Sequence, residues 1–120
     1  SGDVIQLLAD NPKLKWGVPS DGGMIWTDNM FIPQGGSVAT ASTYMNFVYD
    51  PAVAAKIAAY VNYVPLVKGT REELARTDPD TAQNTLIFPD DALLAQLHQY
   101  DSEALNNDEH ITKWQAVLGQ

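Results

Sequence analysis

The dipeptide Asp50-Pro51 limits the possible folds of this chain, because it has the signature of a helix start. Aspartate is a preferred N-cap residue, and proline is well tolerated at the first helical position. Apolar residues and alanines recur at helical spacing over residues 51–61, which predicts a helix able to pack closely. Just upstream, Ser37 is a suitable N-cap for a further helix that runs to Tyr49. The sequence therefore predicts two consecutive helices near the middle of the chain.

Other segments carry weaker signals for helices. Residues 3–10, 90–100 and 107–118 have amphipathic patterns, and Thr70-Arg71-Glu72-Glu73 matches a capping box. In the last of these helices the expected inward-facing residues are Ile111, Trp114, Val117 and Leu118. The segment 85–88 is too short to be assigned. Six helices in all are thus expected along the chain.

Two segments have the composition of β-strands. Residues 14–18 alternate with a period of two and precede a turn-forming stretch at 19–23. Residues 24–32 are rich in β-formers, but Thr27, Asp28 and Asn29 interrupt them. A polar interruption within an apolar strand is typical of a functional position.

Charge and composition exclude several classes of function. The chain of 120 residues has 15 acidic and 7 basic residues, a formal charge of −8, and no cysteine. Nucleic acids and anionic membranes are unlikely partners, because both are bound through clustered basic residues. Disulfides, thiolate nucleophiles and cysteine-based metal sites are excluded. A hydrophobic content of 45% is sufficient for a core, and the length by itself indicates one domain.

Trp26 and Asp28 form the most informative pair of side chains. On an extended strand they leave the same face, since they are two residues apart. An indole beside a carboxylate can receive an ammonium group through cation–π attraction and a charge-assisted hydrogen bond. The alternative is a core tryptophan and a capping aspartate, and the residues alone favour that alternative.

The remaining candidates are weaker. Tyr63 follows a predicted helix in a loop, where binding residues often occur, although a packing role is more common for such a tyrosine. His98 and His110 have no partners at metal-ligand spacing, and no nucleophile or phosphate-loop motif is present. The sequence accordingly predicts no cofactor, no metal and no enzymatic activity.

The sequence resembles the periplasmic spermidine/putrescine-type solute-binding proteins of ABC transporters. The similarity is carried in order by residues 1–3, 22–33 (Gly-Gly-Met-Ile-Trp-Thr-Asp-Asn-Met-Phe-Ile-Pro), 44–54, 63–65 and 87–89. The segment Gly-Gly-x-x-Trp-x-Asp-x-x-x-Ile-Pro is fairly specific. The last 30 residues match only loosely.

This resemblance implies an α/β fold, namely a two-lobed clamp of the type II periplasmic-binding-protein class. It implies that the chain is a C-terminal segment, with residues 1–26 in the second lobe, 27–71 in the first and 72–120 again in the second. Trp26 and Asp28 match family positions that contact the polyamine, Tyr63 matches a ligand-site position that faces the cleft, and Gln99 is the nearest match to a further ligand residue. The implied partners are a small amine, a membrane permease and the remaining N-terminal part of the same protein.

Three alternatives stay open at this stage. The same fold could bind γ-aminobutyrate, which requires an arginine, and the chain has only Arg71 and Arg76. A stand-alone helical module could use the helices at 90–100 and 107–118 to bind a protein. An enzyme with Asp28 as its base is the weakest alternative, because it needs a partner group with a matched pKa.

Overall fold

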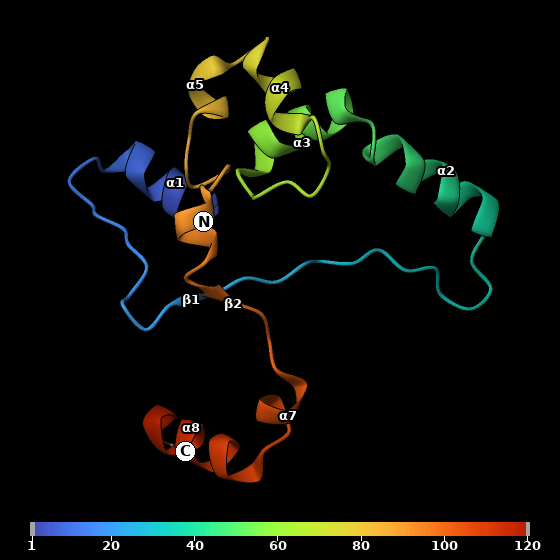
Figure 1. Cartoon of the computed structure of the whole chain (residues 1–120). Coiled ribbons are helices and arrows are strands. Elements are labelled where there is room, and N and C mark those ends of the chain that lie inside the picture. Colours follow the sequence, from blue (N-terminus) through green and yellow to red (C-terminus); the bar gives the residue numbers. More distant parts are fainter. Residues whose placement is uncertain (1, 120) are drawn as a thin grey trace. The chain divides into compact units, whose positions relative to one another are not determined.

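A computed structural model describes residues 2–119, apart from the side chain of Leu105 (Figure 1). These residues form two compact units, one of residues 2–17 and 29–94 and the other of residues 18–28 and 95–119. The first unit holds the helices α1 (Gly2–Asp10), α2 (Val38–Val48), α3 (Pro51–Val61), α4 (Thr70–Ala75), α5 (Pro79–Ala82) and α6 (Asp91–Leu94). The second holds the strands β1 (Gly23–Met24) and β2 (Leu97–His98) and the helices α7 (Ser102–Leu105) and α8 (Asp108–Leu118).

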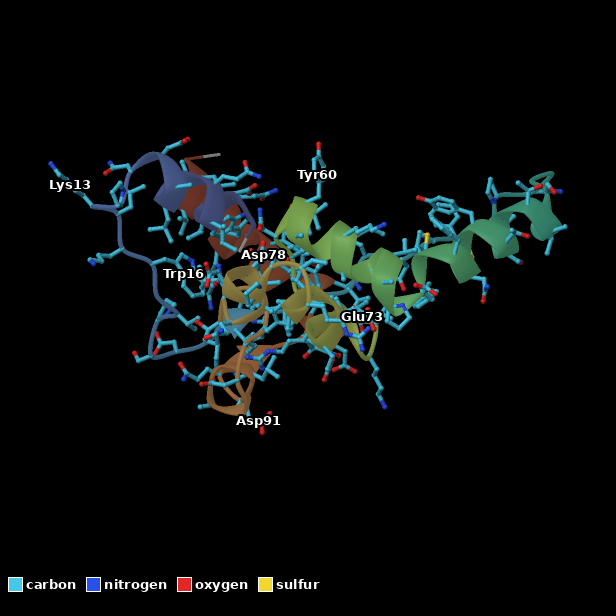
Figure 2. All side chains as sticks on the ribbon, turned by 90° about the horizontal axis from the view of Figure 1, so that it is seen from above. Lys13, Trp16, Tyr60, Glu73, Asp78 and Asp91 are labelled. Atoms are coloured by element: carbon cyan, nitrogen blue, oxygen red, sulfur yellow. The ribbon has the colours of Figure 1, made fainter. Side chains whose placement is uncertain are left out.

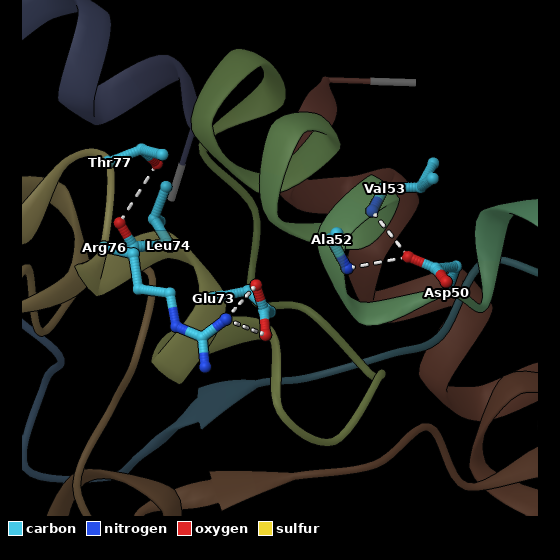
Figure 3. A network of polar contacts seen from close by, with 7 residues as sticks. All are labelled: Asp50, Ala52, Val53, Glu73, Leu74, Arg76 and Thr77. Carbon is cyan, nitrogen blue, oxygen red and sulfur yellow. Dashed lines mark hydrogen bonds and ion pairs between the residues drawn. The ribbon is translucent and has the colours of Figure 1, made fainter.

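The two consecutive helices predicted in the middle of the chain are confirmed as α2 and α3. Asp50 caps α3, because its Oδ1 accepts hydrogen bonds from the backbone N–H groups of Ala52 at 2.9 Å and Val53 at 3.2 Å (Figure 3). Ser37 caps α2 in the same way through Thr40. Side-chain oxygens thus satisfy donors that the first turn of each helix leaves open.

The core of the first unit lies where α3, α4 and α5 meet. Ala55, Leu74 and Ala82 are buried against one another, and Phe88 packs against them. The alanines of α3 permit the close approach that the sequence predicted. Arg71 covers this core, since its Nε donates to the Ala82 carbonyl at 2.9 Å and its guanidinium lies 5.7 Å from the centroid of the Phe88 ring.

The predicted capping box at the start of α4 is wrong. The N-cap is Gly69, whose φ of 85° suits a glycine, and Thr70 is already the first helical residue. The Thr70 hydroxyl is buried and donates to the Val67 carbonyl at 2.7 Å. Glu73 forms an ion pair with Arg76 at 3.0 Å (Figure 3). Both side chains of the expected box therefore have other partners.

A short parallel ladder organises the second unit. Gly23 pairs with Leu97 and Met24 with His98, and the flanking bonds run from Gly23 N to Gln96 O at 3.0 Å and from Ile25 N to His98 O at 2.9 Å. Gly22 makes this approach possible, because its φ is 94° and a Cβ there would lie 2.5 Å from the Gln96 carbonyl oxygen. Two segments far apart in sequence are thereby held in register.

Three predicted elements differ in the structure. Residues 14–18 form no strand, and of residues 24–32 only Met24 belongs to one. The helix expected at 90–100 ends at Leu94, because the backbone of Gln96–His98 bonds to β1 instead. Residues with high β-propensity form a strand only where a neighbouring strand accepts and donates their backbone hydrogen bonds. Within residues 2–119 such pairing extends over only two residues of each strand.

Helix α8 forms at the predicted place, with Asn107 as N-cap and Gly119 at its C-terminal end. The expectation that its apolar side chains face inward is wrong. All residues of α8 are exposed, including Ile111, Trp114, Val117 and Leu118. Among the described elements α8 packs chiefly against the short helix α7, which is too small to cover that face.

The described residues contain eight helices and a single two-stranded sheet. The two-lobed α/β clamp stays a prediction. The predicted lobe boundaries, after residues 26 and 71, also stay a prediction, while the chain passes between its two compact units after residues 17, 28 and 94.

Protonation of Asp78 is expected to destabilise the first unit. Hydrogen bonds from the Thr81 hydroxyl at 2.5 Å and from the Thr81 N–H at 3.0 Å lower the pKa of Asp78 below its ordinary value of 3.8. A carboxyl whose pKa is depressed by folding stabilises the fold above its unfolded pKa and loses this contribution as pH falls through the folded value. Asp78→Asn should therefore lower the melting temperature near pH 7 and have a smaller effect near pH 2.

Thermal denaturation at both pH values checks this expectation. Thr81→Val removes the hydroxyl donor to Asp78, and it should likewise make the melting temperature less dependent on pH. An equal effect of Asp78→Asn at the two pH values would contradict it.

Candidate functional site

Trp26 and Asp28 lie in the second unit, in the extended stretch that leaves β1 (Figure 1). The bond from Ile25 N to His98 O fixes the start of this stretch. The Trp26 side chain is 62% exposed, which is unlike a core tryptophan. Asp28 is exposed, and among the described residues it caps no helix. The structural roles that the sequence offered as alternatives for this pair are therefore not observed.

The carboxylate of Asp28 is available for a charged ligand. Within residues 2–119 it takes part in no hydrogen bond or ion pair. The carboxylate of Asp101, in the same unit, is different, because its Oδ1 caps α7 by accepting from Glu103 N at 2.8 Å. Asp28 is thus the acidic group near Trp26 that has no structural role of its own.

A second aromatic ring lies beside Trp26. The centroid of the Tyr100 ring is 6.1 Å from that of Trp26, and the two planes are tilted by 47°. Tyr100 is 55% exposed, so neither ring of the pair is buried. Sequence reasoning missed Tyr100, because a helix was predicted over residues 90–100 and the strand register that aligns the two rings could not be seen. The local signal was its position next to Gln99.

Gln99 follows β2 directly and is exposed. It belongs to the same unit as Trp26 and Asp28, so the fold places three of the four predicted binding residues in one unit. Its predicted contact with the ligand stays a prediction.

Tyr63 belongs to the other unit and follows the C-terminus of α3. Asn62 ends that helix in the left-handed conformation, with φ of 57°, and so turns the chain toward Tyr63. One side of the Tyr63 ring covers Gly2, where a Cβ would clash with the ring. The ring is still 51% exposed. A packing role is therefore observed, and a second surface remains open for a ligand.

Both arginines of the chain are engaged within the first unit. Arg71 bonds to the Ala82 carbonyl and covers Phe88, and Arg76 binds Glu73 through one guanidinium nitrogen. Figure 2 shows Glu73 among the side chains of this unit, whereas Tyr60 extends away from α3. Both arginines thus belong to the first unit, whereas Trp26 belongs to the second.

The described residues offer neither a metal site nor a membrane-spanning helix. Residues 2–119 contain no cluster of three or more histidine or acidic side chains suited to a metal ion. In the same described range, no helix has the length and apolar character needed to cross a membrane.

Comparison with protein-family profiles identifies a family for most of the chain. A family profile described as bacterial extracellular solute-binding protein covers residues 4–96, which is more than half of the chain. The matched range includes Trp26, Asp28 and Tyr63 and stops before Gln99 and Tyr100. No solved structure matches the chain at a significant level.

Proposed function

The chain belongs to the bacterial extracellular solute-binding proteins, whose role is solute capture for transport, and we propose that its solute is a small amine. The amine is a polyamine such as putrescine or spermidine. It is bound in a cleft between two lobes and is delivered to the permease of an ABC transporter. Family membership implies a periplasmic-binding-protein fold and a periplasmic or extracellular location, and we place the protein in the periplasm.

The observation that carries this proposal is the exposed pair Trp26 and Asp28. An exposed indole offers a π-face to a cation and to an alkyl chain. A carboxylate without a protein partner supplies the opposite charge, and its attraction strengthens when cleft closure excludes water. Neither feature is needed for folding, since Trp26 is outside the core and Asp28 has no partner among the described residues.

Two further residues are proposed in supporting roles. Tyr63 and Gln99 contact the amine, as their family positions imply, and both are exposed. The excess of acidic over basic residues favours the approach of a cation. No chemical step on the solute is required, so the proposed protein is a binder and not an enzyme.

Binding of γ-aminobutyrate is the alternative solute in the same fold. Its carboxylate would require an arginine, and both Arg71 and Arg76 are already engaged in the first unit. The described residues thus favour a ligand that carries ammonium groups without a carboxylate.

Thermal denaturation of the intact protein with each solute tests this proposal. A ligand that binds only the folded state raises the melting temperature in proportion to the logarithm of its concentration. Putrescine or spermidine is expected to produce a clear, saturable increase, and γ-aminobutyrate and glutamate none. An increase in melting temperature with γ-aminobutyrate alone would show that γ-aminobutyrate, and not a polyamine, is the solute. No increase with any amine would overturn it.

A further inference from the structure

We propose that Tyr100 is the second aromatic wall of the amine site, opposite Trp26, so that the bound group is an organic ammonium together with the alkyl chain next to it. This inference rests on the proposed function and deepens it. It concerns a residue beyond the range of the family match and outside the set of ligand residues that the family implies.

The strand register is the first step of the argument. Met24 pairs with His98 in a parallel ladder, and each chain continues for two more residues to reach Trp26 and Tyr100. Side chains two residues apart on an extended chain leave the same face, and equivalent residues of paired parallel strands lie side by side. The ladder therefore brings the two rings together, as the centroid distance of 6.1 Å shows.

The geometry of the rings is the second step. An interplanar angle of 47° shows that the two rings are tilted and are not stacked face to face. Both rings stay more than half exposed, although burial of a tyrosine and a tryptophan against each other is favourable. In the proposed site an ammonium and its alkyl chain contact the exposed parts of both rings, and the π-face of each ring attracts a cation.

The carboxylates are the third step. Asp28 lies two residues beyond Trp26 on the same extended stretch, and it is unpaired within the described residues. Asp101, next to Tyr100, is held in the cap of α7. The two rings thus favour a ligand that has both an alkyl chain and a positive charge, and Asp28 supplies the negative charge that neutralises it.

Calorimetric titration of the intact protein with putrescine tests the role of Tyr100. Tyr100→Leu is expected to weaken binding about five- to tenfold, because it removes one π-face. Tyr100→Phe should bind like the original protein, and Tyr100→Trp at least as tightly, because indole is the strongest of the three rings for cations. Tyr60→Leu is the matched control, since Tyr60 is 86% exposed on α3 of the other unit.

The outcomes separate this inference from the proposed function. Unchanged affinity in Tyr100→Leu, with a clear loss in Asp28→Ala, would overturn the second wall and leave the amine site standing. A loss in Tyr100→Phe as large as in Tyr100→Leu would also overturn it, because the hydroxyl and not the ring would then be responsible. Absence of putrescine binding by the original protein would overturn both. The Phe and Trp variants keep the test decisive if the Leu variant does not fold.

Discussion

Replacement of Asp28 by alanine is expected to weaken putrescine binding by about 30-fold or more, which corresponds to roughly 2 kcal/mol. The reason is that a hydrogen bond to a charged group is stronger than one between neutral groups, and its loss leaves a ligand ammonium without its partner. The proposed closure of the cleft excludes water and makes this loss larger. Isothermal titration calorimetry on the intact protein measures it directly.

Two further variants make the result specific. Asp28→Asn keeps the size of the side chain and removes its charge, so it should lose nearly as much affinity as Asp28→Ala. Asp21→Ala removes one negative charge from an exposed aspartate in the same unit and should have little effect. Equal affinities of Asp28→Ala and Asp21→Ala would show that only net charge matters, and the assignment of Asp28 would be withdrawn.

Leu74→Ala is expected to cause a large loss of stability, about 2–4 kcal/mol. Leu74 is 2% exposed and packs against Ala55 and Ala82, two small side chains that cannot fill the space that its removal would leave. The cost therefore combines lost burial with a cavity between α3, α4 and α5. Chemical denaturation gives the free energy of unfolding, and thermal denaturation should show a melting temperature lower by roughly 10 °C.

Leu66→Ala is the control for this prediction. Leu66 belongs to the same unit and is 65% exposed, so the same substitution should change stability by no more than about 0.5 kcal/mol. Equal effects at the two positions would show that the core is not at the junction of α3, α4 and α5.

Helices were predictable where their ends have local chemistry. Asp50 and Ser37 each cap a helix with their own side chain, and Asn107 and Gly119 bound α8, so a few adjacent residues contain the whole signal. Thr70 shows the limit of this reasoning. Its hydroxyl has two possible backbone partners, and the carbonyl of Val67, three residues before it, is the one bound in the folded chain.

Strands and burial were less predictable, because both depend on a distant partner. Residues 14–18 have the alternation of a strand, yet no ladder forms there in the described structure. Leu97 and His98 were predicted to be helical, but they form a strand because they pair with Gly23 and Met24. The apolar face of α8 was expected to be inside, and its Trp114 is 62% exposed, since periodicity shows which side chains share a face but not what covers it.

The candidate site was likewise only partly predictable from the sequence. Trp26 and Asp28 could be chosen from the sequence because an indole and a carboxylate two residues apart already make an ammonium receptor. Their exposure could not be deduced, because either side chain could equally have served the core or a cap. Tyr100 was missed altogether, since it is 74 residues from Trp26 and only the pairing of β1 with β2 places the rings 6.1 Å apart.

The sequence by itself determined the capped helices, the acidic character and the local receptor pair, because each depends on residues within one or two turns of one another. The tertiary structure alone decided the division into two units, the packing of Tyr63 on Gly2 and the approach of Tyr100 to Trp26. Such contacts join segments that are distant in the chain, and their formation depends on backbone pairing and on shape, which no local pattern of residues encodes.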